Sequence, residues 1–155
     1  MKLLVLAIGD KLPAWAETAV SEYRKRLPRE ARLDVIGLRP ERRSGQPGER
    51  IKAAEAARLL EKCPRDARLV ALDEHGKGLT TRQLASEFQT WSESGRDTVF
   101  LLGGADGLAP EILARAELVL ALSPMTLPHA LARVVLVEQL YRAWSLLAGH
   151  PYHRE

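Results

Sequence analysis

The sequence predicts an α/β fold in which a mostly parallel sheet is covered by helices on both faces. Five short apolar runs recur along the chain, and each is followed by a helix signal or by a turn that leads to one. Strands that are apolar almost throughout are typical of parallel sheets buried on both faces. At 155 residues the chain suits one domain, residues 1–155, with a single core.

The predicted strands are the five apolar runs, at residues 3–8, 33–38, 69–73, 98–102 and 117–122. The first run contains six residues, whereas about 18 are needed to cross a bilayer. No small-residue cleavage site follows it, so the run is predicted to be a buried strand rather than a membrane anchor or a targeting segment.

The helices between these strands are predicted from residues that favour helix starts. These signals are Pro13 in a first turn, Gly48 before residues 49–62, Thr80 as the cap before residues 82–94, and Pro110 before residues 111–115. Each predicted helix therefore connects two predicted strands, as a parallel sheet requires.

The last predicted helix has one broad apolar face when its residues are placed about 100° apart. The face predicted to pack on the sheet carries Val137, Leu140, Tyr141, Trp144, Leu147 and Ala148. The opposite face carries Glu138, Gln139, Arg142 and Ser145, with Glu138 and Arg142 spaced as an exposed i,i+4 ion pair. Gly149 is placed to end the helix.

Three residues of this helix break the pattern. Leu131 and Val135 lie on the otherwise polar side, so a second surface is expected to cover them, most simply in a homodimer. Arg133 projects into the apolar face, where an unpaired charge is costly, and is therefore expected to meet a carboxylate or a ligand oxygen.

The charge and cysteine content limit the function classes. A single cysteine, Cys63, excludes an internal disulfide and a thiolate zinc cluster, which suits a reducing compartment, and we expect the cytoplasm. Residues 1–58 hold 13 of the 23 basic residues against 8 acidic ones, and 17 of the 23 are arginine. The basic clusters within residues 24–32 and 39–52 are interpreted either as a solvated surface or as an RNA-facing patch.

Two strand exits can carry chemistry, because ligands bind outside the carboxyl ends of strands in open α/β sheets. One is the glycine-rich turn at residues 102–107, which reverses the chain or admits a ligand close to the backbone. It is neither a dinucleotide motif nor a P-loop. The other is the proline-stiffened loop at residues 122–128, whose Ser123 and Thr126 either cap the next helix or bind a ligand. Asp73, at the third strand end, meets a ribose or only the following turn.

The chain ends in a segment rich in polar and titratable groups, residues 150–155, with sequence HPYHRE. Any of the four histidines, including His75 and His129, has an ordinary pKa near 6.5 that suits a base. No histidine pair has the spacing of a metal site, and none is predicted.

The LLGGADG turn, the ALSPMTLPH loop, the ARVVLVEQLYRAW helix, the terminal PYHRE and the earlier LDEHGKGLTT together resemble the ribosomal RNA large-subunit methyltransferase H family. This family belongs to the SPOUT class of knotted methyltransferases. The similarity runs from the first strand to the last residue. It departs chiefly at Pro124 and in the arginine-rich residues 39–50.

The resemblance implies a SPOUT-type domain with a C-terminal trefoil knot. It also implies S-adenosylmethionine-dependent methylation of N3 of a pseudouridine in large-subunit (23S) ribosomal RNA, on ribosomes, by a homodimer without metal. The cofactor would be surrounded by Leu72, Asp73, Gly103, Gly104, Ser123, Pro124, Met125, Thr126, Leu127 and Pro128. These residues belong to the strand exits chosen above, which lack a phosphate cradle and so suit a cofactor without phosphates.

For catalysis, the resemblance implies a base and an orienting clamp around the target ring. His153 or His129 is the candidate base, Tyr152 would stack on the ring or hydrogen-bond to it, and Arg142 and Arg154 would hold RNA phosphate or the developing anion. The tail of one subunit would complete the site of the other. The alternatives are a non-catalytic RNA- or ribosome-binding module and, less favoured without a phosphate motif, a doubly wound nucleotide-binding enzyme.

Overall fold

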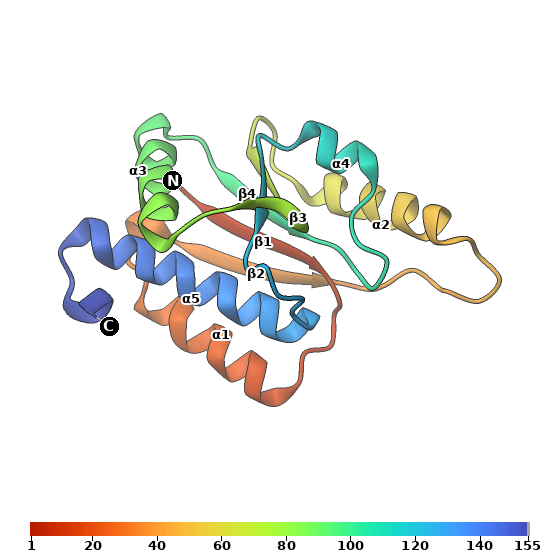
Figure 1. Cartoon of the computed structure of the whole chain (residues 1–155), viewed down its shortest axis with the longest axis horizontal. Coiled ribbons are helices and arrows are strands. Elements are labelled where there is room, and N and C mark those ends of the chain that lie inside the picture. Colours follow the sequence, from red (N-terminus) through yellow and green to blue (C-terminus); the bar gives the residue numbers. More distant parts are fainter. Residues whose placement is uncertain (155) are drawn as a thin grey trace.

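The computed structural model describes residues 1–154, with side chains through residue 152, and contains a five-stranded sheet in the order β2-β1-β4-β3-β5 (Figure 1). All neighbouring strands are parallel. The elements are β1 (Leu3–Ile8), α1 (Ala14–Arg26), η1 (Arg29–Ala31), β2 (Leu33–Leu38), α2 (Gly48–Lys62), β3 (Arg68–Gly78), α3 (Thr81–Ser94), β4 (Thr98–Leu102), α4 (Pro110–Arg115), β5 (Leu118–Ala121), α5 (His129–Ala148) and η2 (Pro151–Arg154).

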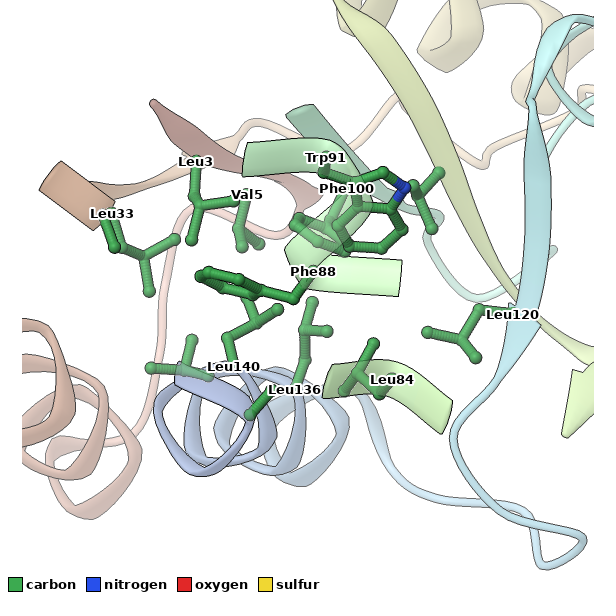
Figure 2. Close-up of a cluster of buried hydrophobic side chains, with 14 of the residues drawn as sticks. Leu3, Val5, Leu33, Leu84, Phe88, Trp91, Phe100, Leu120, Leu136 and Leu140 are labelled. Atoms are coloured by element: carbon green, nitrogen blue, oxygen red, sulfur yellow. The ribbon is translucent and has the colours of Figure 1, made fainter. Parts of the chain in front are cut away.

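Helices cover both faces of the sheet, as the apolar strands predicted. Side chains of α1, α3 and α5 pack on one face, where Phe88, Phe100, Leu136 and Leu140 form the centre of the core (Figure 2). Side chains of α2 and α4 pack on the other face against alternate residues of the same strands. The α/β class and the parallel sheet are therefore confirmed.

The strands β1, β2 and β4 have the predicted bounds, and β5 is shorter by one residue at each end. The prediction was wrong for β3, which continues five residues beyond Asp73 to Gly78. Backbone pairing explains the extension: after a register shift, Lys77 and Gly78 pair with Leu120 and Ala121 of β5. Such pairing at a sheet edge does not require the apolar side chains from which the strand was predicted.

Two predicted helix boundaries rest on side-chain and backbone geometry that the structure confirms. Thr80 and Gln83 form a capping box at the start of α3, because each side chain bonds to the other's backbone N–H. Gly149 ends α5 in the left-handed conformation with φ of 70°, which glycine adopts without strain. The capping box therefore determines where α3 begins, and Gly149 determines where α5 ends and the C-terminal tail begins.

The predicted faces of α5 need correction near its C-terminus. Ser145 is fully buried rather than polar and exposed, and its hydroxyl donates to the Arg142 carbonyl at 2.7 Å. Leu147 and Ala148 are exposed, so the predicted apolar face does not continue through the last turn of the helix. Glu138 and Arg142 form the predicted ion pair, but both side chains are largely buried at 17% and 20% exposure.

Because the strands are parallel, the sheet has two distinct edges. We call the edge where β1, β4 and β5 end the carboxyl edge, and the edge where β1, β2 and β4 begin the amino edge. Helix α5 starts at the carboxyl edge after β5 and ends at the amino edge, where the C-terminus lies (Figure 1). Across the described residues, no helix combines the length and apolarity needed to traverse a membrane.

Candidate functional site

The carboxyl edge brings together three of the segments predicted to bind a cofactor. Leu72 of β3 is the pairing partner of Leu102 in β4 and also of Leu120 in β5. Gly103 follows Leu102, and the loop of residues 122–128 follows β5. The predicted residues Leu72, Asp73, Gly103 and Gly104 and the start of that loop therefore lie side by side, as parallel pairing requires.

The glycine-rich turn after β4 is built by close backbone contacts. The Gly107 N–H donates to the Gly104 carbonyl at 3.0 Å, and Gly107 has φ of 83°. A Cβ on Gly103 would lie 2.5 Å from the carbonyl carbon of Gly107, which is sterically impossible. Glycine at this position therefore allows the chain to fold back on itself directly above the strand end.

The turn is also attached to the arginine-rich connection between β2 and α2. The Arg43 guanidinium donates to both carboxylate oxygens of Asp106, at 2.6 and 3.1 Å. This hydrogen-bonded ion pair lowers the pKa of Asp106 below its ordinary value. A segment distant in sequence is thereby held beside the glycine-rich turn.

Beneath the turn lies Glu55, a buried carboxylate that the sequence reasoning missed. Its Oε2 accepts a hydrogen bond from the Glu41 N–H at 3.1 Å, while its Oε1 has no partner among the described residues. A Cβ on Gly104 would lie 3.1 Å from Oε1. Glu55 occupies the apolar stripe of α2 with Ile51 and Leu59, a signal equivalent to the one that identified Arg133.

The loop of residues 122–128 does not cap α5 through its hydroxyls, so that interpretation was wrong. The Ser123 hydroxyl accepts from the Met125 N–H at 2.9 Å, and the Thr126 hydroxyl donates to Glu74 Oε2 at 3.1 Å. Pro128 is the N-cap residue and provides no side-chain bond. Met125 is 77% exposed. The loop is thus shaped by its own turn and by a contact to Glu74 in the second half of β3.

The two acidic residues after Leu72 turn toward neighbouring chain segments. Asp73 Oδ2 accepts from the His75 N–H at 3.0 Å within the continuation of β3, so the turn that Asp73 was expected to meet is absent and the contact to a ribose stays a prediction. His75 itself is exposed and lies near Asp73 and Glu74. Gly76 passes so close to Val119 that an added Cβ would lie 2.6 Å from its carbonyl oxygen. Glycine is therefore required where this segment crosses β5.

Arg133 is buried in the second turn of α5, at 4% exposure, as its place on the apolar face predicted. The expected carboxylate partner is wrong: Nη2 donates to the Gly9 carbonyl, at the end of β1, at 3.1 Å. Its Nε has no partner among the described residues. Burial lowers the pKa of Arg133. The charge is therefore held near the carboxyl edge with one donor uncommitted in the structure.

The predicted catalytic residues of the tail lie at the other end of α5. Glu138 Oε1 accepts from Arg142 Nε at 2.8 Å and lies 3.1 Å from the Tyr152 hydroxyl. The Arg142 guanidinium stands 4.9 Å from the centre of the Tyr152 ring. Tyr23 of α1, which sequence reasoning missed, lies 3.3 Å from the Tyr152 hydroxyl. Nothing in the local sequence marks Tyr23 as a partner of the tail.

The environment of Tyr152 keeps its phenol protonated. Burial, the hydrogen bond with Tyr23 and the negative charge of Glu138 all raise the pKa of Tyr152. A phenol with a raised pKa serves as a hydrogen-bond donor rather than as a base. Tyr152 also packs edge-to-face on Tyr141, with ring centres 4.6 Å apart, so its position is fixed by several contacts.

The candidate bases are not brought together. His129 is exposed at the first residue of α5, at the carboxyl edge, and is therefore far from Tyr152 along the helix. The side chains of His153 and Arg154 lie outside the described part of the structure. No group of three or more His, Cys, Asp or Glu side chains capable of holding a metal occurs among the described residues.

Comparison with known proteins assigns the chain to a family. The family model described as "Predicted SPOUT methyltransferase" matches residues 1–153. The chain is 52% identical over 155 residues to "Ribosomal RNA large subunit methyltransferase H" of Paraburkholderia xenovorans and likewise of Paraburkholderia phymatum, and 51% identical to that of Burkholderia vietnamiensis. Each alignment covers 99% of both chains.

Among solved structures, the chain is similar to the SpoU methyltransferase AviRb from Streptomyces viridochromogenes, in complex with the cofactor AdoMet. The identity is 17%, the TM-score is 0.46, and the match covers 90% of this chain and 56% of AviRb. A similarity this low does not establish a common fold. The full-length matches above are decisive: the chain belongs to the SPOUT methyltransferases and, among them, to the ribosomal RNA large subunit methyltransferase H family.

Proposed function

We propose that this protein transfers a methyl group from S-adenosylmethionine to N3 of a pseudouridine in large-subunit ribosomal RNA, in the cytoplasm, as a homodimer that acts on ribosomes. The observation that carries the proposal is the 52% identity over essentially the whole length of curated relatives named as large-subunit RNA methyltransferases. The arrangement of the two edges of the sheet supports it independently.

The carboxyl edge has the features that this cofactor requires. The cofactor has no phosphate, and the strand ends offer backbone groups of Gly103 and Gly104 and a proline-containing loop rather than a phosphate-binding motif. Leu72 and the loop residues Ser123, Pro124, Met125, Thr126, Leu127 and Pro128 would hold its adenosine and methionine portions. The uncommitted Nε of Arg133 fits a polar ligand at this edge. When bound, the cofactor supplies an electrophilic methyl group.

The tail supplies the groups that would orient the target base. Tyr152, kept protonated, donates a hydrogen bond to the ring or stacks on it. Arg142, positioned by Glu138, stabilises the negative charge that develops on the base when N3 loses its proton. His153 or His129 accepts that proton, and Arg154 holds RNA phosphate.

These two sets of residues lie too far apart to act within one chain. Helix α5 has 20 residues, so its ends are about 30 Å apart. The predicted cofactor residues lie at its first end and Tyr152 lies at its last. Two copies packed with their α5 helices antiparallel would bring the tail of each to the carboxyl edge of the other. The half-buried Leu131 and Val135 and the exposed Trp15 provide apolar surface for such packing.

The trefoil knot belongs to the same proposal. The segment from β4 through α5 would thread the chain end through the loops that form the cofactor pocket. Supporting it, the 73–78 segment crosses β5 at the close contact between Gly76 and Val119. A stably folded domain fused to the C-terminus is expected to slow refolding severalfold, because it must pass through the loop. An unchanged refolding rate would argue against threading.

The reaction is tested directly with purified protein, S-adenosylmethionine and ribosomes or free large subunits from cells that lack this methylation. Nuclease digestion and mass mapping should locate one added methyl group on N3 of a pseudouridine. Methylation elsewhere would refute the position. Binding of the ribosome without methyl transfer, with no binding of S-adenosylmethionine by calorimetry, would instead indicate a non-catalytic RNA-binding module.

A further inference from the structure

The basic residues near the N-terminus form two separate surfaces at opposite edges of the sheet. Arg43 and its neighbours in residues 39–47 follow β2 and so lie at the carboxyl edge. Arg24, Lys25, Arg29 and Arg32 lie at the amino edge, between the end of α1 and the start of β2. The sequence shows two basic clusters close together along the chain, and the structure separates them by the length of the strands.

The basic residues at the amino edge line an open pocket with a volume of about 430 Å³, which we call the arginine pocket. Its nine lining residues include the charged side chains of Arg24, Lys25, Arg29, Arg32 and Asp34. Four of the nine are cationic and one is acidic. The pocket is open to solvent, so a bound group would stay partly exposed.

Positive charge exceeds negative charge in this pocket. Asp34 is the partner of three cations, with Arg24 at 3.2 Å, Arg32 at 3.4 Å and Lys2 at 3.6 Å. Lys25 and Arg29 have no carboxylate within ion-pair distance among the described residues. One carboxylate cannot neutralise this cluster, so an anion that binds there gains attraction from several cations.

Two hydrogen bonds also fix the side chain of Arg24 in the pocket. Its Nε donates to the Leu33 carbonyl at 3.0 Å, and its Nη2 donates to Asp34 Oδ1 at 3.2 Å. A guanidinium fixed in this way loses less side-chain freedom when it binds phosphate. Excess positive charge and a fixed arginine favour anion binding at this shallow, open pocket over a merely solvated basic surface.

The arginine pocket and the tail share one turn of α1. Tyr23 contacts the Tyr152 hydroxyl at 3.3 Å, while the adjacent Arg24 lines the pocket. Arg26 lies 5.3 Å from the centre of the Tyr23 ring and 5.8 Å from that of Tyr141, between the same elements. If the tail reaches the partner subunit's cofactor edge, the pocket is brought to the margin of that same active site.

We propose that the arginine pocket binds backbone phosphates of the substrate RNA, and that it does so for the active site whose cofactor is bound by the partner subunit. The inference rests on the proposed homodimeric methyltransferase. Each subunit would then contribute both the tail that orients the target base and the phosphate contacts beside it. Non-specific phosphate contacts position an RNA without reading its sequence.

The first test measures RNA binding without requiring turnover. In the intact dimer, Lys25→Gln with Arg29→Gln removes two cations that have no ion-pair partner among the described residues. Its control, Lys62→Gln with Arg65→Gln, removes two exposed cations at the end of α2 and just after it, at the amino edge but on the other face. Affinity for large ribosomal subunits is measured against salt concentration.

The pocket variant should bind large subunits on the order of tenfold more weakly than the control, with a salt dependence shallower by about 1.4 in log–log slope. Affinity for S-adenosylmethionine should be unchanged. Equal binding by the two variants would overturn the pocket's role, even if the enzyme methylates normally. Saturable binding of inorganic phosphate together with unchanged affinity for subunits would identify a free-anion site and would equally refute the proposal.

The second test assigns the pocket to a subunit. Heterodimers purified through two tags combine the pocket variant with a cofactor-site variant, Gly104→Val, or Thr126→Trp if the first does not fold. With the defects on different subunits, one complete site remains and about half of the wild-type rate is expected at low subunit concentration. With both defects on one subunit, the rate should fall on the order of tenfold further. The reverse pattern would show that the pocket serves the cofactor of its own subunit.

Discussion

Replacing Gly104 with alanine tests how the glycine-rich turn is supported. The new Cβ would lie 3.0 Å from Ile8 Cγ2 and 3.1 and 3.3 Å from the two carboxylate oxygens of Glu55. Ile8 and Glu55 are both buried, so neither can move freely into solvent. Overpacking of this kind costs about 1–3 kcal/mol. Displacement of Glu55 would also weaken its hydrogen bond to the Glu41 N–H, worth about 1 kcal/mol.

The expected loss for Gly104→Ala is therefore about 2–3 kcal/mol in the free energy of unfolding. Urea denaturation followed by circular dichroism should show a midpoint lower by about 1–1.5 M, for a slope near 2 kcal/mol/M. Gly48→Ala is the matched control, because its Cβ would make only ordinary contacts of 3.5 and 3.8 Å with Asp106. That variant should match or slightly exceed wild-type stability. Equal midpoints for Gly104→Ala and the wild type would refute the packing of the turn on Glu55.

Three further outcomes follow from the tail and from the single cysteine. Glu138→Gln removes the charge that positions Arg142, so kcat should fall on the order of tenfold and the free energy of unfolding by about 1 kcal/mol. A wild-type kcat would contradict the proposed role of Arg142 in orienting the target base. The pKa of Tyr152 is raised on folding, so its stabilising contribution is complete below about pH 10 and is lost as the pH rises further. Alkaline denaturation of Tyr152→Phe should therefore lack that loss, and identical curves would refute the assignment. Burial raises the pKa of the Cys63 thiol, which also donates a hydrogen bond to the Leu59 carbonyl. A disulfide reagent should therefore react with Cys63 slowly at pH 7 in the native protein and quickly in urea.

Local signals predicted most of the fold because they depend on neighbouring residues. Thr80 and Gln83 satisfy each other's backbone within one helical turn, and Gly149 adopts a conformation that few other residues tolerate. Apolar runs located β1, β2 and β4 with correct bounds. The end of β3 was missed because its last residues, including Lys77 and Gly78, are held by pairing with a strand that lies 40 residues further along the chain.

The candidate site was predictable where its residues follow strand ends, since parallel pairing alone brings Leu72 beside Leu102 and Leu120. The contacts made by the charged residues of the site were not predictable from the sequence. The position of Arg133 within an apolar helix face predicted that its side chain is buried. Its hydrogen-bond partner, however, is the backbone carbonyl of Gly9, 124 residues away in the sequence. No periodicity encodes such a contact, because it depends on how β1 and α5 pack.

The tail illustrates the same limit. Its polar residues indicated function, yet Tyr152 is held by Tyr23, which is 129 residues distant and belongs to α1. The structure thereby divides the predicted site residues between the two ends of α5. This separation supports a second subunit as the means of completing the site, which the sequence suggested only through its family resemblance.

The proposed composite active site is tested most directly by complementation between two inactive proteins. One lacks residues 152–155, and the other carries a cofactor-site substitution that abolishes binding of S-adenosylmethionine by calorimetry. Each homodimer should be inactive on large ribosomal subunits, whereas a purified heterodimer contains one complete site and should methylate at about half of the wild-type rate. An inactive heterodimer, or a tail-deleted homodimer with full activity, would contradict a site shared between subunits.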